Sequence, residues 1–187
     1  MTARHFVEAF RRRARVNELT AEDGERLDEI ADRFVATLRG GGTLYFAGNG
    51  GSAADAQHVA TEYVVRYKAD RRPLRAIALT TDTSLLTAAG NDIGFDQVFA
   101  RQVEALARAG DLLVIHSTSG NSPNVLRAAE AAKARGVDVL AFSARDGGEL
   151  RALASHSVVI PTSRTDRAQE LHLCIEHIIC DLVEQTL

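Results

Sequence analysis

Residues 43–52 read TLYFAGNGGS, a short apolar run that ends in a turn of glycine, asparagine and serine. A helical pattern follows this turn as far as about Arg66. A continuous apolar run of this length, followed at once by glycines and a helix, is typical of a strand that is buried on both faces of a parallel sheet. The stretch therefore predicts the first strand–turn–helix unit of an α/β fold.

The same unit recurs along the rest of the chain. Four further short apolar runs predict strands at 75–79, 111–116, 137–143 and 157–160. Helical patterns separate or follow them at 83–89, at 95–107, from Pro123 onwards and from Thr165 to the end. Short continuous strands that alternate with helices indicate an α/β fold with a doubly wound, five-stranded parallel sheet flanked by helices.

Two helical patterns precede the first strand. One runs from about His5 to Leu19, and the next from Thr20 to the glycines at 40–42. Linkers, repeats and low-complexity segments are absent from the sequence, and its length suits one domain. We therefore expect residues 1–187 to form a single domain with two extra N-terminal helices.

The composition narrows the function classes. The share of hydrophobic residues, 45%, is that of an ordinary globular protein, and a formal net charge of −3 gives no basic footprint for nucleic acid or an anionic membrane. Apolar stretches stay well short of the roughly 20 residues of a membrane span, and the mixed, charged start is unlike a signal peptide. Cys174 and Cys180 lie on one predicted helix, about 9 Å apart along its axis, too far for a disulfide. We expect two buried free cysteines and a cytoplasmic protein.

The loop 117–122 reads STSGNS and opens a helix at Pro123. Four hydroxyl side chains and the backbone N–H groups of a helix N-terminus suit a phosphate dianion. The loop contains no lysine, so it is not the P-loop of a nucleotide-binding protein. We expect it to hold a sugar phosphate through neutral donors; the alternative is a capped turn of small polar residues.

The loop 48–52 reads GNGGS and follows the first strand. It does not match the dinucleotide pattern GxGxxG, and the second strand does not end in an acidic residue, so a dinucleotide site is weakly supported. In a doubly wound fold this loop lies at the carboxyl edge of the sheet, where ligands bind. A plain strand–helix turn would also use glycines. We nevertheless expect four residues of this loop to meet sugar hydroxyls or phosphate: Asn49, Gly50, Gly51 and Ser52.

Two predicted helices carry a candidate cluster of acid, base and metal-binding groups. His58 and Glu62 are four residues apart and share a helix face, as do Gln169 and His177 on the last helix. The first two are a fair pair of metal ligands, and His177 would supply a third. A surface contact is the alternative for a His/Glu pair at this spacing.

The other histidines receive structural interpretations. We assign His172 and Glu176, on another face of the last helix, to a surface or subunit contact. His116, which ends the third predicted strand, is interpreted as a half-buried histidine with a satisfied hydrogen bond, and His156 as exposed.

Taken together, these segments resemble the sugar isomerase (SIS) domain family over nearly the whole chain. Two motifs are specific for the family, GNGGSAADAQH at 48–58 and STSGNSPNVL at 117–126. Glu62 and the segment AQELHLCIEH at 168–177 narrow the resemblance to its heptose-phosphate branch. The remaining matches are ALTTDTSLLTAAGND at 78–92, FARQVEAL at 99–106 and RDGG at 145–148.

The resemblance implies an active site and an assembly. The family assembles as homotetramers with sites between subunits, built partly with the helices of residues 1–40 and the last helix. The implied substrate contacts are Asn49, Gly50, Gly51, Glu62, Asn91, Asp92, Ser117, Thr118, Ser119, Ser122 and Gln169, to which Ser52 and Asp166 are added from their loop positions. The implied zinc ligands, one ion per subunit, are His58, Glu62, Gln169 and His177.

The implied activity is an aldose–ketose isomerisation that converts sedoheptulose 7-phosphate to D-glycero-D-manno-heptose 7-phosphate through an enediol. Our hypothesis is that Glu62 moves the carbon-bound proton and that His177 serves the oxygens. His116 departs from the small or apolar residue that we expect before the phosphate loop, where it would touch the loop or pack beside it. Three alternatives stay open: a non-catalytic tetrameric scaffold that binds the replication initiator, an isomerase for another sugar phosphate, and a phosphosugar sensor that controls transcription.

Overall fold

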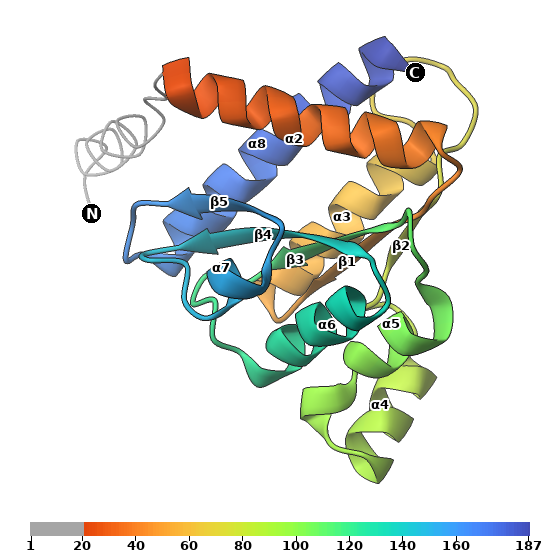
Figure 1. Cartoon of the computed structure of the whole chain (residues 1–187), viewed down its shortest axis with the longest axis vertical. Coiled ribbons are helices and arrows are strands. Elements are labelled where there is room, and N and C mark those ends of the chain that lie inside the picture. The colour runs from red at the N-terminus through yellow and green to blue at the C-terminus, as the bar shows by residue number, and fades with distance from the viewer. Residues whose placement is uncertain (1–20) are drawn as a thin grey trace, which may run out of the picture.

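The computed structural model describes residues 21–187 (Figure 1). The helix expected at 5–19 lies outside the described residues. The strands are β1 (Leu44–Gly48), β2 (Ala76–Ala78), β3 (Leu112–His116), β4 (Asp138–Ala144) and β5 (His156–Ile160). The helices are α2 (Ala21–Arg39), α3 (Gly51–Val64), α4 (Thr83–Asp92), α5 (Ala100–Leu106), α6 (Pro123–Ala134), α7 (Leu150–Leu153) and α8 (Thr165–Thr186), with a 3₁₀ turn η2 (Phe95–Gln97).

The five strands form one parallel sheet in the order β2-β1-β3-β4-β5. The chain first moves outward from β1 to β2 and then returns to the other side of β1 to form β3. The carboxyl ends of β1 and β3 are therefore neighbours, with Gly48 opposite His116. This is the switch point of the sheet, where doubly wound folds bind their ligands.

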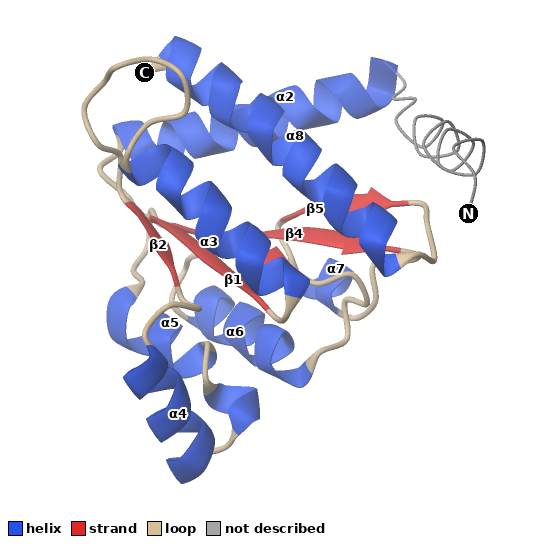
Figure 2. Ribbon diagram, turned by 180° about the vertical axis from the view of Figure 1, so that it is seen from behind, coloured by secondary structure: helices blue, strands red, loops and turns tan. Residues whose placement is uncertain are grey.

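Helices cover both faces of the sheet. The α2, α3 and α8 helices lie on one face, and α4, α5, α6 and α7 on the other (Figures 1 and 2). In β1, Leu44 and Phe46 pack under the first group of helices, whereas Tyr45 and Ala47 pack under the second. Side chains of a strand alternate between faces, so two apolar layers require a continuous apolar run. The predicted fold class is confirmed.

The element boundaries differ from expectation in a few places. The helix expected at 95–107 is divided into η2 and α5, with the buried Val98 and Phe99 between them. A 3₁₀ turn is a common way for an α-helix to begin, so the division is small. The α4 helix continues past Ala89 to Asp92. Across residues 21–187 we find no helix with the length and apolar character needed to cross a membrane.

The α3 and α8 helices lie side by side and run in the same direction (Figure 2). Near their ends the carboxylate of Glu184 accepts hydrogen bonds from the backbone N–H groups of residues 67–69 and from Nε of Arg71, at 2.7–3.1 Å. Arg71 also donates to the carbonyl oxygens of Glu62 and Tyr63, at 2.6 and 3.0 Å. Burial alone would raise the pKa of Glu184, but these donors hold it below its usual value. The network ties the end of α3 to α8.

Candidate active site

The two loops at the switch point are joined by a pair of amide side chains. Asn49 follows β1, and Asn124 lies in the first turn of α6. Each side chain donates to the carbonyl oxygen of the other at 2.8 Å. Asn124 is only 2% exposed, so the pair fixes the loop after β1 against the helix that follows the loop after β3. The amide of Asn49, predicted to contact substrate, is oriented by this pairing.

The loop 117–122 is supported by the loop that follows β4. Gly120 has a φ of 65°, and a Cβ atom there would lie 1.9 Å from the carbonyl oxygen of Gly147. Only glycine fits at this position. Ser117 is buried, Thr118 and Ser119 are partly exposed, and Ser122 occupies the N-cap position of α6. The predicted phosphate loop therefore connects the buried strand β3 to the helix α6, as expected.

Gln169 of α8 lies against the start of α3. A Cβ atom at Gly51 would lie 2.6 Å from both the amide nitrogen and the amide oxygen of Gln169, so a larger residue would displace the glutamine. Ser52, next to it, is 4% exposed. The structure thus brings Gln169 to the glycine loop, where the sequence placed Gly50, Gly51 and Ser52 as substrate contacts.

About two helical turns further along, His58 and Glu62 of α3 meet His177 of α8. The Nε2 atoms of the two histidines are 3.0 Å apart, and Nε2 of His58 is 3.4 Å from Oε1 of Glu62. One ligand atom from each of the three residues lies within 4.8 Å of the others. The His58 side chain is 46% exposed and that of Glu62 is 17% exposed, so the cluster is open to solvent. Two imidazoles and a carboxylate in this arrangement could hold a metal ion.

The remaining predicted contacts lie elsewhere. Asn91 and Asp92 are exposed at the end of α4, where Nδ2 of Asn91 donates to Oδ1 of Asp92 at 2.7 Å. Because α4 covers the opposite face of the sheet from α3 and α8, a single chain, as far as it is described, does not bring them to the His/Glu/His cluster. Asp166, in the first turn of α8, pairs with Arg164 at 2.8 Å, and this hydrogen bond lowers the pKa of Asp166.

Two interpretations of α8 were wrong. His172 and Glu176 do not lie on the surface, because they are 0% and 1% exposed. Glu176 pairs with His116, and His116 is fully buried where we expected it to be half buried. Cys174 is exposed, whereas Cys180 is buried as expected. One signal in the sequence could have revealed the face, because His172 and Glu176 share the helical spacing of buried α8 residues: Ala168, Ile175, Ile179 and Val183.

Burial also changes the protonation of His172. Its Nε2 atom is 3.0 Å from the carbonyl oxygen of Ser143 in β4. Burial lowers the pKa of His172 to about 4, against the opposing effect of that carbonyl. The imidazole is therefore neutral near pH 7, and its Nε2–H group donates a hydrogen bond to the carbonyl oxygen of Ser143.

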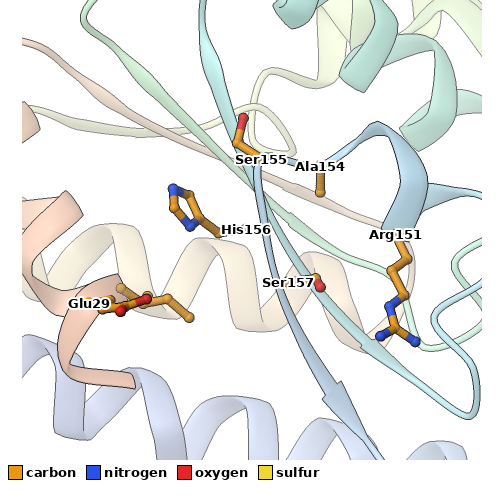
Figure 3. Close-up of a pocket in the computed structure, with 7 residues that line it drawn as sticks. Glu29, Arg151, Ala154, Ser155, His156 and Ser157 are labelled. Carbon is orange, nitrogen blue, oxygen red and sulfur yellow. The ribbon is translucent and has the colours of Figure 1, made fainter. Parts of the chain in front are cut away.

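A cavity of about 380 Å³ lies away from these loops, beside the start of β5 (Figure 3). It is lined by Glu29, Ile30, Arg151, Ala154, Ser155, His156 and Ser157. His156, expected to be exposed, is partly buried here. The residues of the cavity are distinct from the predicted site residues, and β5 begins rather than ends there, so the candidate site remains at the carboxyl edge.

The loops at the switch point, the α3/α8 pair and the strand order together define an α/β domain with a candidate ligand site at the carboxyl edge of its sheet. The model of the family described as "SIS domain" matches residues 5–144, and the chain belongs to this family. Within the family it groups with the phosphoheptose isomerases. The protein of that name from Pelobacter propionicus is 53% identical over 171 residues, which cover 91% of this chain and 90% of the relative.

Two solved structures support the grouping. Phosphoheptose isomerase GmhA from Neisseria gonorrhoeae is 44% identical, with a TM-score of 0.86 over 98% of this chain and 96% of that one. A phosphoheptose isomerase from Francisella tularensis is 33% identical, with a TM-score of 0.90 over 99% of this chain and 100% of that one. The likeness therefore extends over the whole fold, the last helix included.

Proposed function

We propose that this protein interconverts sedoheptulose 7-phosphate and D-glycero-D-manno-heptose 7-phosphate in the cytoplasm, as the first step towards nucleotide-activated heptose. The observation that carries the proposal is the meeting of two loops suited to phosphate at the switch point of the sheet, one of which opens α3, the helix that carries His58 and Glu62 of the His/Glu/His cluster. The names of the close relatives agree with this chemistry.

Three helix N-termini favour a phosphorylated substrate at this edge. The α3, α6 and α8 helices each follow a parallel strand, so their N-termini lie at its carboxyl edge. The positive ends of the helix dipoles attract a phosphate dianion. In the loop 117–122, Ser117, Thr118, Ser119 and Ser122 add hydroxyl donors. Neutral donors would bind phosphate while leaving it free to depart with the product.

The cluster suits one zinc ion per subunit. His58, Glu62 and His177 would supply nitrogen and carboxylate ligands, which zinc prefers, and Gln169 would be an unusual amide ligand. When bound, zinc would polarise the substrate carbonyl and stabilise an enediolate as a Lewis acid. A test is zinc titration of the purified protein: we expect His58→Ala to weaken binding, and equal affinity of the variant and the wild type would contradict this ligand set.

The proton transfers are assigned to two side chains. The Glu62 carboxylate takes a proton from C1 of the ketose and returns it to C2 of the enediol. His177 donates a proton to the oxygen on C2 and accepts one from the oxygen on C1. Each role places a basic or acidic group beside a reacting atom, which contributes roughly 10²–10⁴-fold to the rate. Tight metal binding would reduce the basicity of Glu62, so the metal is proposed to be loosely held.

We further propose that the chain forms a homotetramer with active sites between subunits, built partly with residues 1–40. Three apolar side chains near the cluster are exposed in one chain: Val64 at 42%, Val65 at 67% and Ile178 at 46%. A second copy would cover such a surface and could add residues such as Asn91 and Asp92 to the site. Light scattering on the purified protein should give the mass of four chains; a monomer would contradict the proposal.

The experiment that tests the activity is proton NMR of the metal-replete protein with sedoheptulose 7-phosphate. We expect the signals of an aldoheptose 7-phosphate to appear. Pentose and hexose phosphates run in parallel would identify an isomerase for another sugar phosphate. A folded tetramer that turns over none of these sugars would contradict the enzyme assignment and favour a scaffold.

A further inference from the structure

A buried polar contact joins the end of β3 to α8. His116 and Glu176, 0% and 1% exposed, lie 60 positions apart in the chain, and Nε2 of His116 is 2.6 Å from Oε1 of Glu176. This short distance is characteristic of a hydrogen bond with an ionised partner. Burial alone would lower the pKa of His116, but the adjacent carboxylate raises it above its usual value.

Aromatic rings hold the histidine in place. The His116 ring stacks between Phe46 of β1 and Phe142 of β4, with centroid distances of 6.4 and 5.4 Å. The ring faces the helices α3 and α8, because it continues the side of β3 that carries Leu112 and Val114. His116 therefore faces α3 and α8 rather than α6, the helix that the phosphate loop opens.

Glu176 lies next to a residue of the His/Glu/His cluster. Glu176 immediately precedes His177, and four residues earlier His172 bonds to the carbonyl oxygen of Ser143. Inward side chains of α8 such as Ile175 and Ile179 make apolar contacts, which are not directional, and the directional contacts of Glu184 lie further along, near the end of the helix. A displacement of α8 by one residue would move His177 by about 1.5 Å and turn it by about 100°.

We propose that the His116–Glu176 pair is a positioning element that fixes α8 against the sheet, so that His177 meets His58 and Glu62 while Gln169 meets Gly51. The proposal rests on the proposed function of these residues. Both members of the pair are buried away from the His/Glu/His cluster, so they act through His177. The pair also accounts for the histidine at a position where the family resemblance implied a small or apolar residue.

The test separates positioning from stability. It compares the full-length wild type with Glu176→Gln, Glu176→Leu and the double variant His116→Phe/Glu176→Leu. The measurements are kcat, KM, the Kd for zinc, the thermal midpoint and the crystallographic distance between His58 and His177. Val183→Ala is the matched control, because Val183 is buried on the same helix and 1% exposed.

We expect Glu176→Leu to lower kcat and zinc affinity by roughly 10–100-fold, with KM changed less than about threefold, and to lengthen the His58–His177 distance. Glu176→Gln should keep most of the wild-type kcat and zinc affinity, because glutamine retains an oxygen that can accept the hydrogen bond from His116. The double variant should recover the thermal midpoint, since the unpaired buried histidine is gone, but not kcat or zinc affinity. Val183→Ala should lower only the midpoint.

Unchanged kcat, zinc affinity and His58–His177 distance in Glu176→Leu and in the double variant, with only the midpoint altered, would overturn the proposal. The readouts also separate it from the proposed function. A wild type without isomerase activity would contradict the function alone, because the zinc Kd and the crystallographic distance would still report on positioning.

Discussion

The two helical layers that enclose the sheet differ in chemistry. On the α3/α8 side, buried ionisable groups lie among the apolar residues, including His116, His172 and Glu176. On the α4–α7 side, α6 packs small residues such as Ala128 and Ala129, and the buried polar side chains include the amides of Gln102 and Asn124.

The two faces of the sheet therefore have different roles. Small side chains on the α4–α7 side allow close, uniform packing, which holds the strand ends and their loops in place. On the α3/α8 side, His116 and Glu176 pair with each other and His172 bonds to the carbonyl oxygen of Ser143, and such partners make buried polar groups tolerable. Changes on the two sides should therefore affect different measured quantities.

The largest effect is expected for Glu62→Gln, which removes the proposed base from the α3/α8 side. The substitution should lower kcat by roughly 10²–10⁴-fold in the NMR assay with little change in fold by circular dichroism. Glu104→Gln, at an exposed carboxylate of α5, is the matched control on the other side and should keep kcat within about twofold. Near-normal turnover of Glu62→Gln would show that the proposed base is wrong.

Leu113→Ala should affect stability instead of catalysis. Leu113 is 0% exposed and faces the α4–α7 side, so the cavity left behind should lower the free energy of unfolding by about 2–5 kcal/mol. Urea unfolding at a fixed protein concentration measures this loss, and kcat per folded molecule should stay near the wild-type value. A tenfold fall in kcat of the folded variant would contradict the proposal that changes on the α4–α7 side affect stability and not catalysis.

His172 should make stability depend on pH. Its pKa is lowered from 6.5 to about 4 by burial, so between these values the unfolded chain binds a proton that the folded chain does not. The free energy of unfolding should therefore fall as pH falls from 6.5 to 4, by on the order of 3 kcal/mol from this group. His172→Gln, which keeps a donor for Ser143, should have a flatter profile across that window; identical profiles would contradict the assignment.

The smallest effect is expected for Glu184→Gln. The variant loses charge-assisted bonds to residues 67–69 and Arg71, and we expect it to lower the free energy of unfolding by about 1–3 kcal/mol at neutral pH. Because the pKa of Glu184 is lowered, the difference from wild type should disappear as pH falls through that pKa. Glu130→Gln, an exposed carboxylate of α6, should change stability by less than about 0.5 kcal/mol; an equal loss in both variants would contradict the role of the Glu184 network.

The fold could be predicted from short sequence patterns, each of which lies within a single strand, turn or helix. Short apolar runs marked all five strands, and Pro123 marked the start of α6 as predicted. The cluster of His58, Glu62 and His177 followed from helical spacing together with the family resemblance, since spacing alone does not say which helices meet.

Contacts between distant segments could not be predicted in this way. The pairing of His116 with Glu176 depends on which face of α8 turns inward, and the pairing of Asn49 with Asn124 depends on two loops that meet only in the folded sheet. Asn91 and Asp92 remain predicted site residues, because their place in a site depends on the proposed assembly.

Because α3 and α8 run in parallel and contact each other along their length, neither helix can gain or lose residues independently of the other. Gly51 faces Gln169, His58 faces His177 and residues 67–69 face Glu184, so the two helices advance together. One residue inserted into or deleted from either helix would turn every later side chain by about 100° and separate these partners. Insertions and deletions should therefore be tolerated far better in exposed loops that make none of these contacts than within α3 or α8, and a redesign of chain length is confined to such loops.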